Sequence, residues 1–507
     1  MNLFKIFSKR DQEIQHLKAE LKKRSYDAAL FSRLTSDWIQ GETSGDAETL
    51  PSLYTLRNRA RQVAENNPYG KRFLELVCVN MIGANGIRAI FAIKHPGSGN
   101  PDDYAANILE AAWTDWGKRG NCTTDKKLSW LEVQHLIAKT VARDGECLAQ
   151  FLRGNAAGNK YGFALKILES DYLDENYNFE TPTSVIRMGV QVNKITGEPE
   201  GYWLFTRHPG DIGGGLWSQS NRHIFVPASD LLHIYDTDRA SSTRGVTWMA
   251  AALKTMYILG QYEEAELIGA RAGACQMGFY ETSDGQYTGE KDENGNLTTK
   301  AEPGTFELLP PGVKFNDFTP QHPAGNFSPF VQHLIRKCAS GLSVAYSSLA
   351  SDYAQANYSS ERAAQLVERN TWTRKQTLFV GRVNQPVYEN WLDMALLSGA
   401  LDPLSNSKYD KYNAVIWRPR RWENIDPVKD TTAAGMAIDR ALLSRQDYIA
   451  QSGEDFYDIV DKLADEEAYL KSKNVSVIIG NGKAGEIVNP PGPGTTQPET
   501  KPQPGVN

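Results

Sequence analysis

A long helical pattern in the second half of the chain most constrains how this sequence can fold. It begins at Ser359 or Ser360, either of which offers an N-cap, and continues to about Ala400. Residues 359–385 alone would span roughly 40 Å at about 1.5 Å per residue. Pro386 is expected to kink the helix, because it lacks a backbone N–H and its ring crowds the preceding turn. A helix of this length usually organises other elements, so we expect it to act as a spine.

The segment before this spine, residues 35–243, reads as mixed α and β. The apolar periodicity predicts helices over residues 53–82, 104–117 and 130–143, and strands over residues 146–152, 164–170, 185–192, 201–205 and 231–235. The turn at 193–198 contains Thr196-Gly197 and predicts a hairpin. We expect Trp113, Trp116 and Trp130 to anchor the core of this segment.

A helix, an insert and a second helix are predicted between this segment and the spine. Residues 246–281 are largely helix-compatible, and their glycines indicate either that another helix packs closely or that the helix is simply buried. Residues 282–328 are dense in Gly and Pro and contain Asn294-Gly295, which predicts a small, strand-containing insert. A helix follows to about Tyr346, and residues 347–358 are polar and read as a loop.

The two ends of the chain differ from its middle. Residues 1–34 carry eight Lys/Arg against four Asp/Glu, with Ile14, Leu17 and Leu21 at helical spacing. This basic arm is either a solvated helix or mobile arm, or a docking helix for a partner. Residues 430–472 predict short helices, with a capping box at Ser444 and Asp447 and a stop at Gly453; a Pro-rich, disordered or extended tail follows.

Composition excludes several classes of protein. The chain has 507 residues, enough for about three domains, and no run of about 18 uncharged apolar residues, so we expect no membrane span. The net charge of −6 argues against gripping nucleic acid through overall charge. The five cysteines form no C-x-x-C pair, which disfavours a disulfide framework or zinc ribbon and favours a reducing compartment.

The sequence motifs that would indicate nucleotide binding, metal binding or catalysis are weak or absent. There is no phosphate-binding loop, and the G-x-G-x-x-G at residues 480–485 is followed by prolines rather than the helix a dinucleotide site needs. His233, Asp236 and Asp238 could bind a divalent metal, although acidic strand ends are common without one. The acidic run 169–175 reads as an exposed loop. We therefore expect no catalytic, cofactor-binding or metal-binding residue, and no enzyme.

A basic cluster leaves two interpretations open. Arg418, Arg420 and Arg421 could contact phosphates, or they could pair with the nearby carboxylates of Glu423 and Asp426.

The order of these features resembles the portal proteins of tailed bacteriophages, of the lambda-like family. Three stretches carry the resemblance: residues 233–236 (HIYD) leading to 244–246 (RGV), residues 352–362 (DYAQANYSSER), and residues 417–455, from Trp417 and Pro419 through Ile425-Asp426-Pro427 to Gly453-Glu454-Asp455. It covers about residues 35–470, and the third stretch is its most specific part.

The resemblance implies a predominantly helical α+β, portal-type fold that assembles as a ring of about twelve copies. It implies these segments: basic N-terminal arm 1–34, wing 35–243, stem helices 244–280 and 329–347, clip 281–328, tunnel loop 348–358, spine helix 359–400, crown 401–472 and disordered tail 473–507. It implies a channel for double-stranded DNA, with a loop that faces the DNA through Asp352, Tyr353, Gln355, Asn357 and Tyr358. The implied protein partners are the terminase large subunit, major capsid and scaffolding proteins and a head–tail connector, with no membrane partner. The implied location is the portal vertex of the capsid, after assembly in the host cytoplasm.

Two other functions stay open at this point. A catalytic DNA-packaging subunit, such as a terminase or nuclease, would need a phosphate-binding loop or a carboxylate metal cluster. Another structural virion protein would not explain the order of helix, insert, helix, loop and spine.

Overall fold

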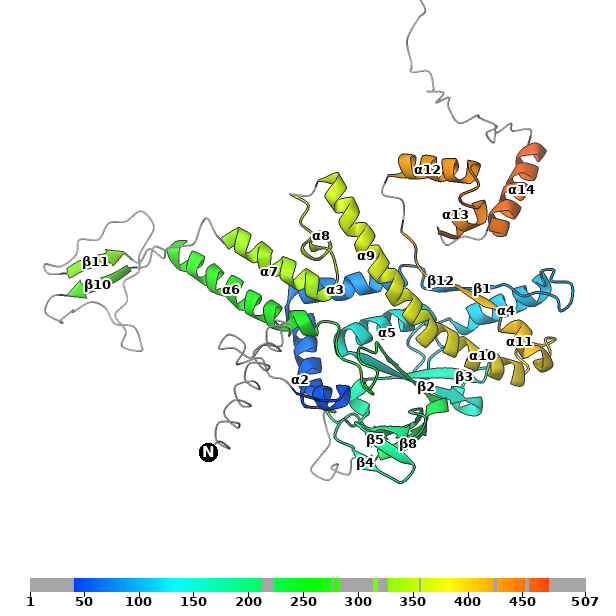
Figure 1. Ribbon diagram of the computed structural model, residues 1–507, viewed down its shortest axis with the longest axis horizontal. Helices are drawn as coiled ribbons and strands as arrows, with labels where there is room; N and C mark the ends of the chain where they lie inside the picture. Colours follow the sequence, from blue (N-terminus) through cyan, green and yellow to red (C-terminus); the bar gives the residue numbers. More distant parts are fainter. Residues whose placement is uncertain are drawn as a thin grey trace, which may run out of the picture. The chain divides into compact units, whose positions relative to one another are not determined.

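The computed structural model describes residues 41–211, 223–274, 278–282, 313–317, 327–354, 357–422, 426–451 and 456–473. The chain divides into two compact units, Met1–Arg420 and Arg421–Asn507, which are described separately. Figure 1 shows the order of the elements along the chain.

Two helices open the described part of the first unit. Helix α2 (Gly45–Asn66) begins at Ser44, whose side chain accepts from the Ala47 amide. Asn67 ends α2, and its side chain caps α3 (Pro68–Val77) by accepting from two amides of the first turn. The single helix predicted over 53–82 is therefore wrong: two helices are present, because an Asn-Pro pair stops one and starts the next. A π-helical turn, Cys78–Ile82, follows α3.

The helices predicted over 104–117 and 130–143 are confirmed as α4 (Asp103–Trp116) and α5 (Trp130–Asp144). Ser129 and Glu132 form a reciprocal capping box at the start of α5. The core role predicted for the tryptophans is also confirmed. Trp113 lies with its ring centroid 4.8 Å from Trp116 and 5.9 Å from Trp130, and all three side chains are buried.

A three-stranded antiparallel sheet of order β3-β2-β9 lies next to these helices. It comprises β2 (Glu146–Arg153), β3 (Phe163–Leu168) and β9 (Leu231–Tyr235). These strands confirm three of the predicted strands to within two residues.

A second, five-stranded antiparallel sheet runs in the order β4-β5-β6-β7-β8. Its strands are β4 (Phe179–Glu180), β5 (Ser184–Arg187), β6 (Val190–Asn193), β7 (Pro199–Phe205) and β8 (His223–Pro227). The single strand predicted over 185–192 is wrong, because Met188 and Gly189 both have positive φ and turn the chain into a hairpin. The hairpin predicted at 193–198 is confirmed.

The two sheets share a hydrophobic core. Its buried residues are Leu148, Leu168, Leu173, Val190, Tyr202, Leu204, Val226 and Leu231. Because side chains alternate along a strand, this packing buries one face of the five-stranded sheet and leaves the other for different contacts.

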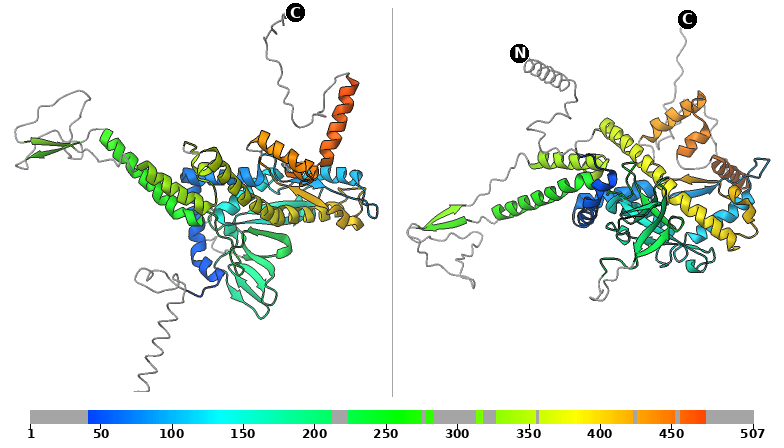
Figure 2. Two further views of the ribbon diagram at one scale, coloured as in Figure 1. Left: turned by 45° about the horizontal axis from the view of Figure 1, so that its top comes forward. Right: turned by 60° about the horizontal axis from the view of Figure 1, so that its bottom comes forward.

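Two helices lie side by side after the sheets, as Figures 1 and 2 show. Helix α6 (Ala250–Ala274) contacts α7 (Phe327–Leu342) in an antiparallel arrangement, since Tyr262 stacks on Phe327 and Gly341 faces Ala251. Close helix packing is therefore present, and Gly341 of α7 lies at the contact.

A pair of strands lies at the start of the predicted insert and within it. Strand β10 (Gly278–Thr282) pairs antiparallel with β11 (Val313–Asp317). The prediction of strands in the insert is confirmed, whereas the helix expected to reach residue 281 ends at Ala274. The turn at Asn294-Gly295 lies outside the described residues.

The predicted spine is present as two helices joined by a π-helical turn. Helix α9 (Tyr358–Phe379) leads through Val380–Asn384 into α10 (Gln385–Leu397). Pro386 lies in the first turn of α10, where its missing N–H is tolerated, and the wider π turn directly precedes it. The N-cap of α9 is Asn357, so the assignment of the cap to Ser359 or Ser360 is wrong.

The first unit closes with a long-range strand pair. After α11 (Tyr409–Tyr412), strand β12 (Val415–Arg418) pairs antiparallel with β1 (Arg88–Phe91). The pairing of residues 415–418 with β1 joins the start of the implied crown to the first unit.

The second unit contains α12 (Pro427–Asp439), α13 (Arg445–Gln451) and α14 (Phe456–Ser472), which confirms the prediction of short helices. At Ser444 the hydroxyl accepts from the Asp447 amide and donates to the Asp447 carboxylate. Gly453, the tail and the basic arm lie outside the described residues. Within the part of the chain that the structure describes, none of the helices is long and apolar enough to span a membrane.

Candidate functional site

The polar segment between α7 and α9 is the region to which the resemblance assigns contact with DNA. It does not form a loop throughout, because Tyr346–Ala350 make a short helix, α8, whose Leu349 is buried. The loop proper starts at Ser351, whose φ of 53° lies in the left-handed region. The prediction of a loop over residues 347–358 is therefore wrong for residues 347–350.

The expected DNA-facing residues have different environments. Tyr353 and Tyr358 are 58% and 53% exposed. The Asn357 side chain instead accepts from the Ser360 amide at the start of α9. The Asp352 carboxylate accepts a hydrogen bond from the Tyr346 hydroxyl at 2.8 Å and another from the Ala354 amide at 3.1 Å. Gln355 lies outside the described residues.

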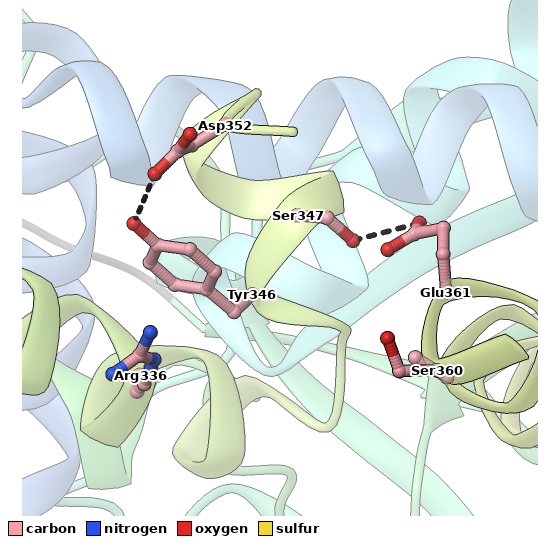
Figure 3. Close-up of a pocket in the computed structure, with 7 residues that line it drawn as sticks. Arg336, Tyr346, Ser347, Asp352, Ser360 and Glu361 are labelled. Atoms are coloured by element: carbon pink, nitrogen blue, oxygen red, sulfur yellow. Dashed lines mark hydrogen bonds between the residues drawn. The ribbon is translucent and has the colours of Figure 1, made fainter. Parts of the chain in front are cut away.

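A cavity of about 210 Å³ lies beneath this loop, between the ends of α7, α8 and α9 (Figure 3). It is lined by Arg336, Tyr346, Ser347, Asp352, Ser360, Glu361 and Ala364. The Arg336 guanidinium lies 5.0 Å from the centre of the Tyr346 ring, within the range of a cation–π contact. On the opposite wall, the Ser347 hydroxyl donates to Glu361 at 2.9 Å.

The electrostatics of the loop base follow from these hydrogen bonds. The Ala354 amide and the Tyr346 hydroxyl both stabilise the ionised carboxylate, and they lower the pKa of Asp352. Burial and the same carboxylate raise the pKa of Tyr346. Asp352 thus keeps its charge and points it back at α8.

Glu368 on α9 holds α8 in place. Its carboxylate accepts from the Ala345 amide at 3.0 Å, from the Ser348 hydroxyl at 2.7 Å and from the Trp372 indole at 2.9 Å. Glu368 is buried, so these donors satisfy a carboxylate that water hardly reaches. The spine helix therefore fixes the start of the polar segment.

A second carboxylate, Glu146, is the centre of what we term the junction cluster: Arg57, Glu146, His233, Arg244 and Gly245. Glu146 is fully buried at the start of β2. It accepts from Arg57 at 2.8 Å, from Arg244 through its Nε at 2.9 Å, from His233 at 2.8 Å and from the Gly245 amide at 3.2 Å. These partners come from α2, from β9 and from the segment that leads into α6.

In the junction cluster, burial and ion pairing shift the pKa of Glu146 in opposite directions. Burial alone would raise the pKa of Glu146, but the charge of Arg244 and the His233 hydrogen bond outweigh it and hold the pKa well below its usual range. Burial lowers the pKa of His233, so this imidazole is neutral near pH 7. Two glycines allow the close approach, since a Cβ on Gly145 or Gly245 would lie within 2.6 Å of the other's carbonyl oxygen.

The acidic run 169–175 is not the exposed loop that its sequence predicts. Asp171 accepts from Arg61 at 2.5 Å, and Arg61 also binds Asp144 at 2.9 Å. Burial would raise the pKa of Asp171, but the hydrogen bond from Arg61 lowers it overall. The sequence contains a signal for this pairing that was missed: Arg57 and Arg61 are one helical turn apart, so both lie on the same face of the helix.

The candidate metal ligands of the sequence do not converge. His233 binds Glu146, whereas Asp236 lies 3.8 Å from Arg374. Across the described ranges, one other group, Glu169, Asp171 and His208, brings potential ligand atoms within 4.8 Å of one another. Arg61 already neutralises its central carboxylate, and we assign no metal to it.

In the basic cluster at 418–421, the hydrogen bonds of Arg420 go to the π-helical turn, and they decide neither interpretation from the sequence. Arg420 donates to the Val79 carbonyl at 2.8 Å and to the Asn80 side chain. Asp426 caps α12 and pairs with Lys429 at 2.9 Å. Glu423 lies outside the described residues.

Comparisons with known proteins give the class. The family model described as "Phage portal protein, lambda family" matches residues 31–376. This chain belongs to the lambda family of phage portal proteins. Its relatives include the probable portal protein of Halomonas phage phiHAP-1, 33% identical over 456 residues that cover 87% of this chain and 86% of that protein. Portal protein B of Escherichia phage lambda is 22% identical over 468 residues, covering 85% and 86%.

Solved structures give weaker similarities. A chain from the neck of an empty GTA particle has a TM-score of 0.40 at 14% identity, covering 83% of this chain and 98% of that one. A chain from the virion of a native gene transfer agent particle has a TM-score of 0.38, with coverage of 83% and 97%.

Proposed function

We propose that this portal protein forms a ring of about twelve copies at the portal vertex of a phage capsid, with double-stranded DNA passing through its centre. The observation that carries this proposal is the family match, which spans the wing, the stem, the loop and most of the first spine helix. A ring requires a head-to-tail interface that closes after a fixed rotation. Electron micrographs of the purified chain test it: rings with a central hole support the proposal, and monomers or open filaments contradict it.

Different segments of the chain would then contact different partners. The insert at 281–328 would contact the terminase large subunit during packaging and a head–tail connector afterwards, while other surfaces contact the major capsid and scaffolding proteins. Replacing this insert by a short linker should leave rings intact but remove motor docking. Loss of the ring itself would place the insert within the subunit interface. Assembly would take place in the host cytoplasm, and no enzymatic step is proposed for the chain.

The loop after α8 would face the DNA. Tyr353 and Tyr358 support this role because both are exposed and uncharged, and Gln355 between them is polar. Such side chains can meet phosphates without the fixed positive charge that would retain DNA. Asp352 and Asn357 are assigned a different role here: they shape the loop through hydrogen bonds to Tyr346 and to the first turn of α9.

A charge substitution tests the loop without disturbing its supports. Tyr353→Lys combined with Gln355→Lys should add phosphate contacts in every copy and slow packaging or ejection, and salt should relieve the defect. Tyr353→Gln is the matched control, because it removes the ring and adds no charge. Asn357 is left unchanged, since its loss would uncap α9. Normal packaging at low salt by the Lys variant, with rings formed, would remove the loop from the DNA path.

A further inference from the structure

The outer face of the five-stranded sheet carries a cluster of aromatic side chains to which the proposed function assigns no role. This aromatic face comprises Tyr177, Phe179, Trp203, Phe205, His223 and Phe225. Trp203 lies opposite Phe225 on neighbouring strands, with ring centroids 5.3 Å apart, and Phe205 lies opposite His223 at 4.9 Å. These residues alternate with Tyr202, Leu204 and Val226 of the core, so they point to the opposite side of the sheet.

The aromatic face is open among the described residues. Phe225 is 42% exposed and Phe179 is 60% exposed, while Trp203 and Phe205 are half-buried. Within the described ranges, β5, β6 and β8 pair with strands of their own sheet, and it is the opposite face of this sheet that packs on the three-stranded sheet. Figure 2 shows this sheet as a layer of strands at the margin of the first unit. Aromatic clusters of this kind on a surface mark interaction sites.

The backbone beneath the aromatic face is adapted to it. A Cβ on Gly201 would lie 2.3 Å from the Phe225 ring, so only glycine lets this ring lie flat across β7. The sheet thus supports a defined aromatic surface rather than a chance exposure of single side chains.

A fixed negative charge adjoins the aromatic face. The Glu200 carboxylate accepts from Ser184 at 2.7 Å, from Gln191 at 2.8 Å and from Asn193 at 3.1 Å. The hydrogen bonds from Gln191 and Ser184 lower the pKa of Glu200, which keeps it ionised. All three donors are uncharged, so they hold the carboxylate in place without neutralising it. Residues 174–205 carry five carboxylates against two basic side chains, which makes the whole region acidic.

These features define the chemistry of a partner. Aromatic faces attract Lys and Arg cations, and an ionised carboxylate pairs with them. The exposed rings also offer apolar contact. The matching partner is therefore a basic, amphipathic peptide segment.

The chain itself contains such a segment. Residues 1–34 carry eight Lys/Arg against four Asp/Glu, and Ile14, Leu17 and Leu21 recur at helical spacing. Asp46, at the start of α2, lies 3.7 Å from Arg187 at the end of β5, so the chain enters the described region at the edge of this sheet, on the side of the core. The six residues 35–40 can span up to about 20 Å when extended, which matches the width of a five-stranded sheet at about 4.8 Å per strand.

We propose that the basic N-terminal arm, residues 1–34, docks on the aromatic face of the wing sheet. Its lysines and arginines contact the rings and Glu200, and its apolar residues cover Phe225 and Phe179. The arm comes from the same copy or from a neighbouring one. The docking does not depend on the ring, and its test is separate from the test of the portal function.

Zero-length cross-linking of the full-length chain with a carbodiimide tests the proposal. Peptide mass spectrometry should find links from Lys18, Lys22 or Lys23 to Glu200, Glu198 or Glu180. A mixture of ¹⁴N- and ¹⁵N-labelled chains shows whether the arm comes from the same copy, and either origin supports the docking. Links from the arm to carboxylates elsewhere, or no links, overturn it.

Hydrogen–deuterium exchange gives an independent readout. The full-length variant Lys22→Gln/Lys23→Gln/Arg24→Gln should raise exchange across β7 and β8 several-fold, because the arm leaves the sheet. The control Lys126→Gln/Lys127→Gln removes two of the exposed lysines elsewhere and should change nothing there. If the sheet is equally protected in both variants, another occupant covers it, such as residues 212–222, which contain no lysine to give these cross-links, and the proposal is wrong.

Discussion

The junction cluster and the loop base each use one buried carboxylate to hold the backbone of a following segment, but they hold it with different strength. Glu146 is fully buried and binds two arginines, a histidine and the Gly245 amide. Glu368 binds an amide, a hydroxyl and an indole, all of them uncharged. Beyond Glu368, the loop itself depends on Asp352, which lies at the solvent edge.

The difference between the junction cluster and the loop base indicates which of the two regions is the more rigid. A buried carboxylate with two guanidinium partners cannot lose one of them without leaving a buried charge unpaired. A carboxylate at the solvent edge, such as Asp352, can exchange the hydrogen bond of a neutral donor for one from water at a small net cost in free energy. The entry into α6 is therefore fixed, whereas the loop can open at a small cost in free energy. The four substitutions below test this contrast.

The largest effect is expected at Glu146. Glu146→Ala leaves Arg57 and Arg244 buried without their shared partner, and we expect a loss of about 3–5 kcal/mol in the free energy of unfolding. Chemical denaturation measures it. The control is Glu48→Ala, which breaks an exposed pair with Arg239 and should cost less than about 1 kcal/mol. Similar losses in both variants would remove the contrast between the junction cluster and ordinary surface pairs.

At Lys375 we expect a substitution to increase stability rather than to decrease it. It is buried on α9 and lies 3.1 Å from the centre of the Trp248 ring, in the segment that leads into α6. Burial lowers its pKa to about 8, and the charge of Asp236 only partly compensates. The folded chain therefore binds fewer protons than the unfolded chain between about pH 8 and 10.5. Stability rises with pH in that window, and below it the buried cation costs roughly 3 kcal/mol.

Lys375→Met should accordingly stabilise the chain at pH 7 by up to about 3 kcal/mol, less the lost cation–π contact. The gain should disappear above about pH 10.5, where the wild-type side chain is neutral in both states. Thermal unfolding at pH 7 and at high pH measures both values. Arg374→Met, at the exposed neighbour, should show no such pH dependence. A destabilised Lys375→Met variant at pH 7 would mean that the lysine is an essential part of the junction.

A smaller effect is expected at Glu368. Glu368→Gln keeps the shape of the side chain but replaces one acceptor by a donor, which leaves a buried donor facing the Ala345 amide or the Trp372 indole. We expect a loss of about 1–3 kcal/mol. Hydrogen exchange at residues 345–350 should rise more than in the rest of the chain. Glu361→Gln is the control, since Glu361 accepts from Ser347 at the edge of the cavity. Uniform faster exchange throughout the unit would show that Glu368 supports the core rather than α8.

The parts of this fold that sequence predicts are those fixed by local patterns. The helix at Trp130–Asp144 shows its cap and its apolar period in fifteen residues, and strand β2 follows directly after Gly145. Glu146 could not be assigned, because its partners lie 89 and 98 positions away and nothing near it distinguishes it from an exposed glutamate.

The loop shows a different limit of sequence reasoning. The resemblance implies that Asp352 and Asn357 face DNA, and in the structure each side chain accepts from an amide two or three residues further on. Those short spacings are typical of Asx turns and N-caps, so the local signal was present in the sequence. Polarity alone does not separate a residue that contacts a ligand from one that shapes the backbone.

The smallest effect, and the sharpest test of the loop, is expected at Tyr346. Tyr346→Phe removes the hydroxyl that donates to Asp352 and keeps the ring beside the Arg336 guanidinium. Because Asp352 is reached by water, the lost hydrogen bond is replaced, and the free energy of unfolding should fall by no more than about 1 kcal/mol. Exchange at residues 351–354 should nevertheless become faster, since the loop loses its tie to α8. Tyr358→Phe is the matched control: it loses a hydroxyl next to the same loop but leaves Asp352 bound. Unchanged exchange at 351–354 in Tyr346→Phe would show that the Ala354 turn and the N-cap at Asn357 hold the loop without α8.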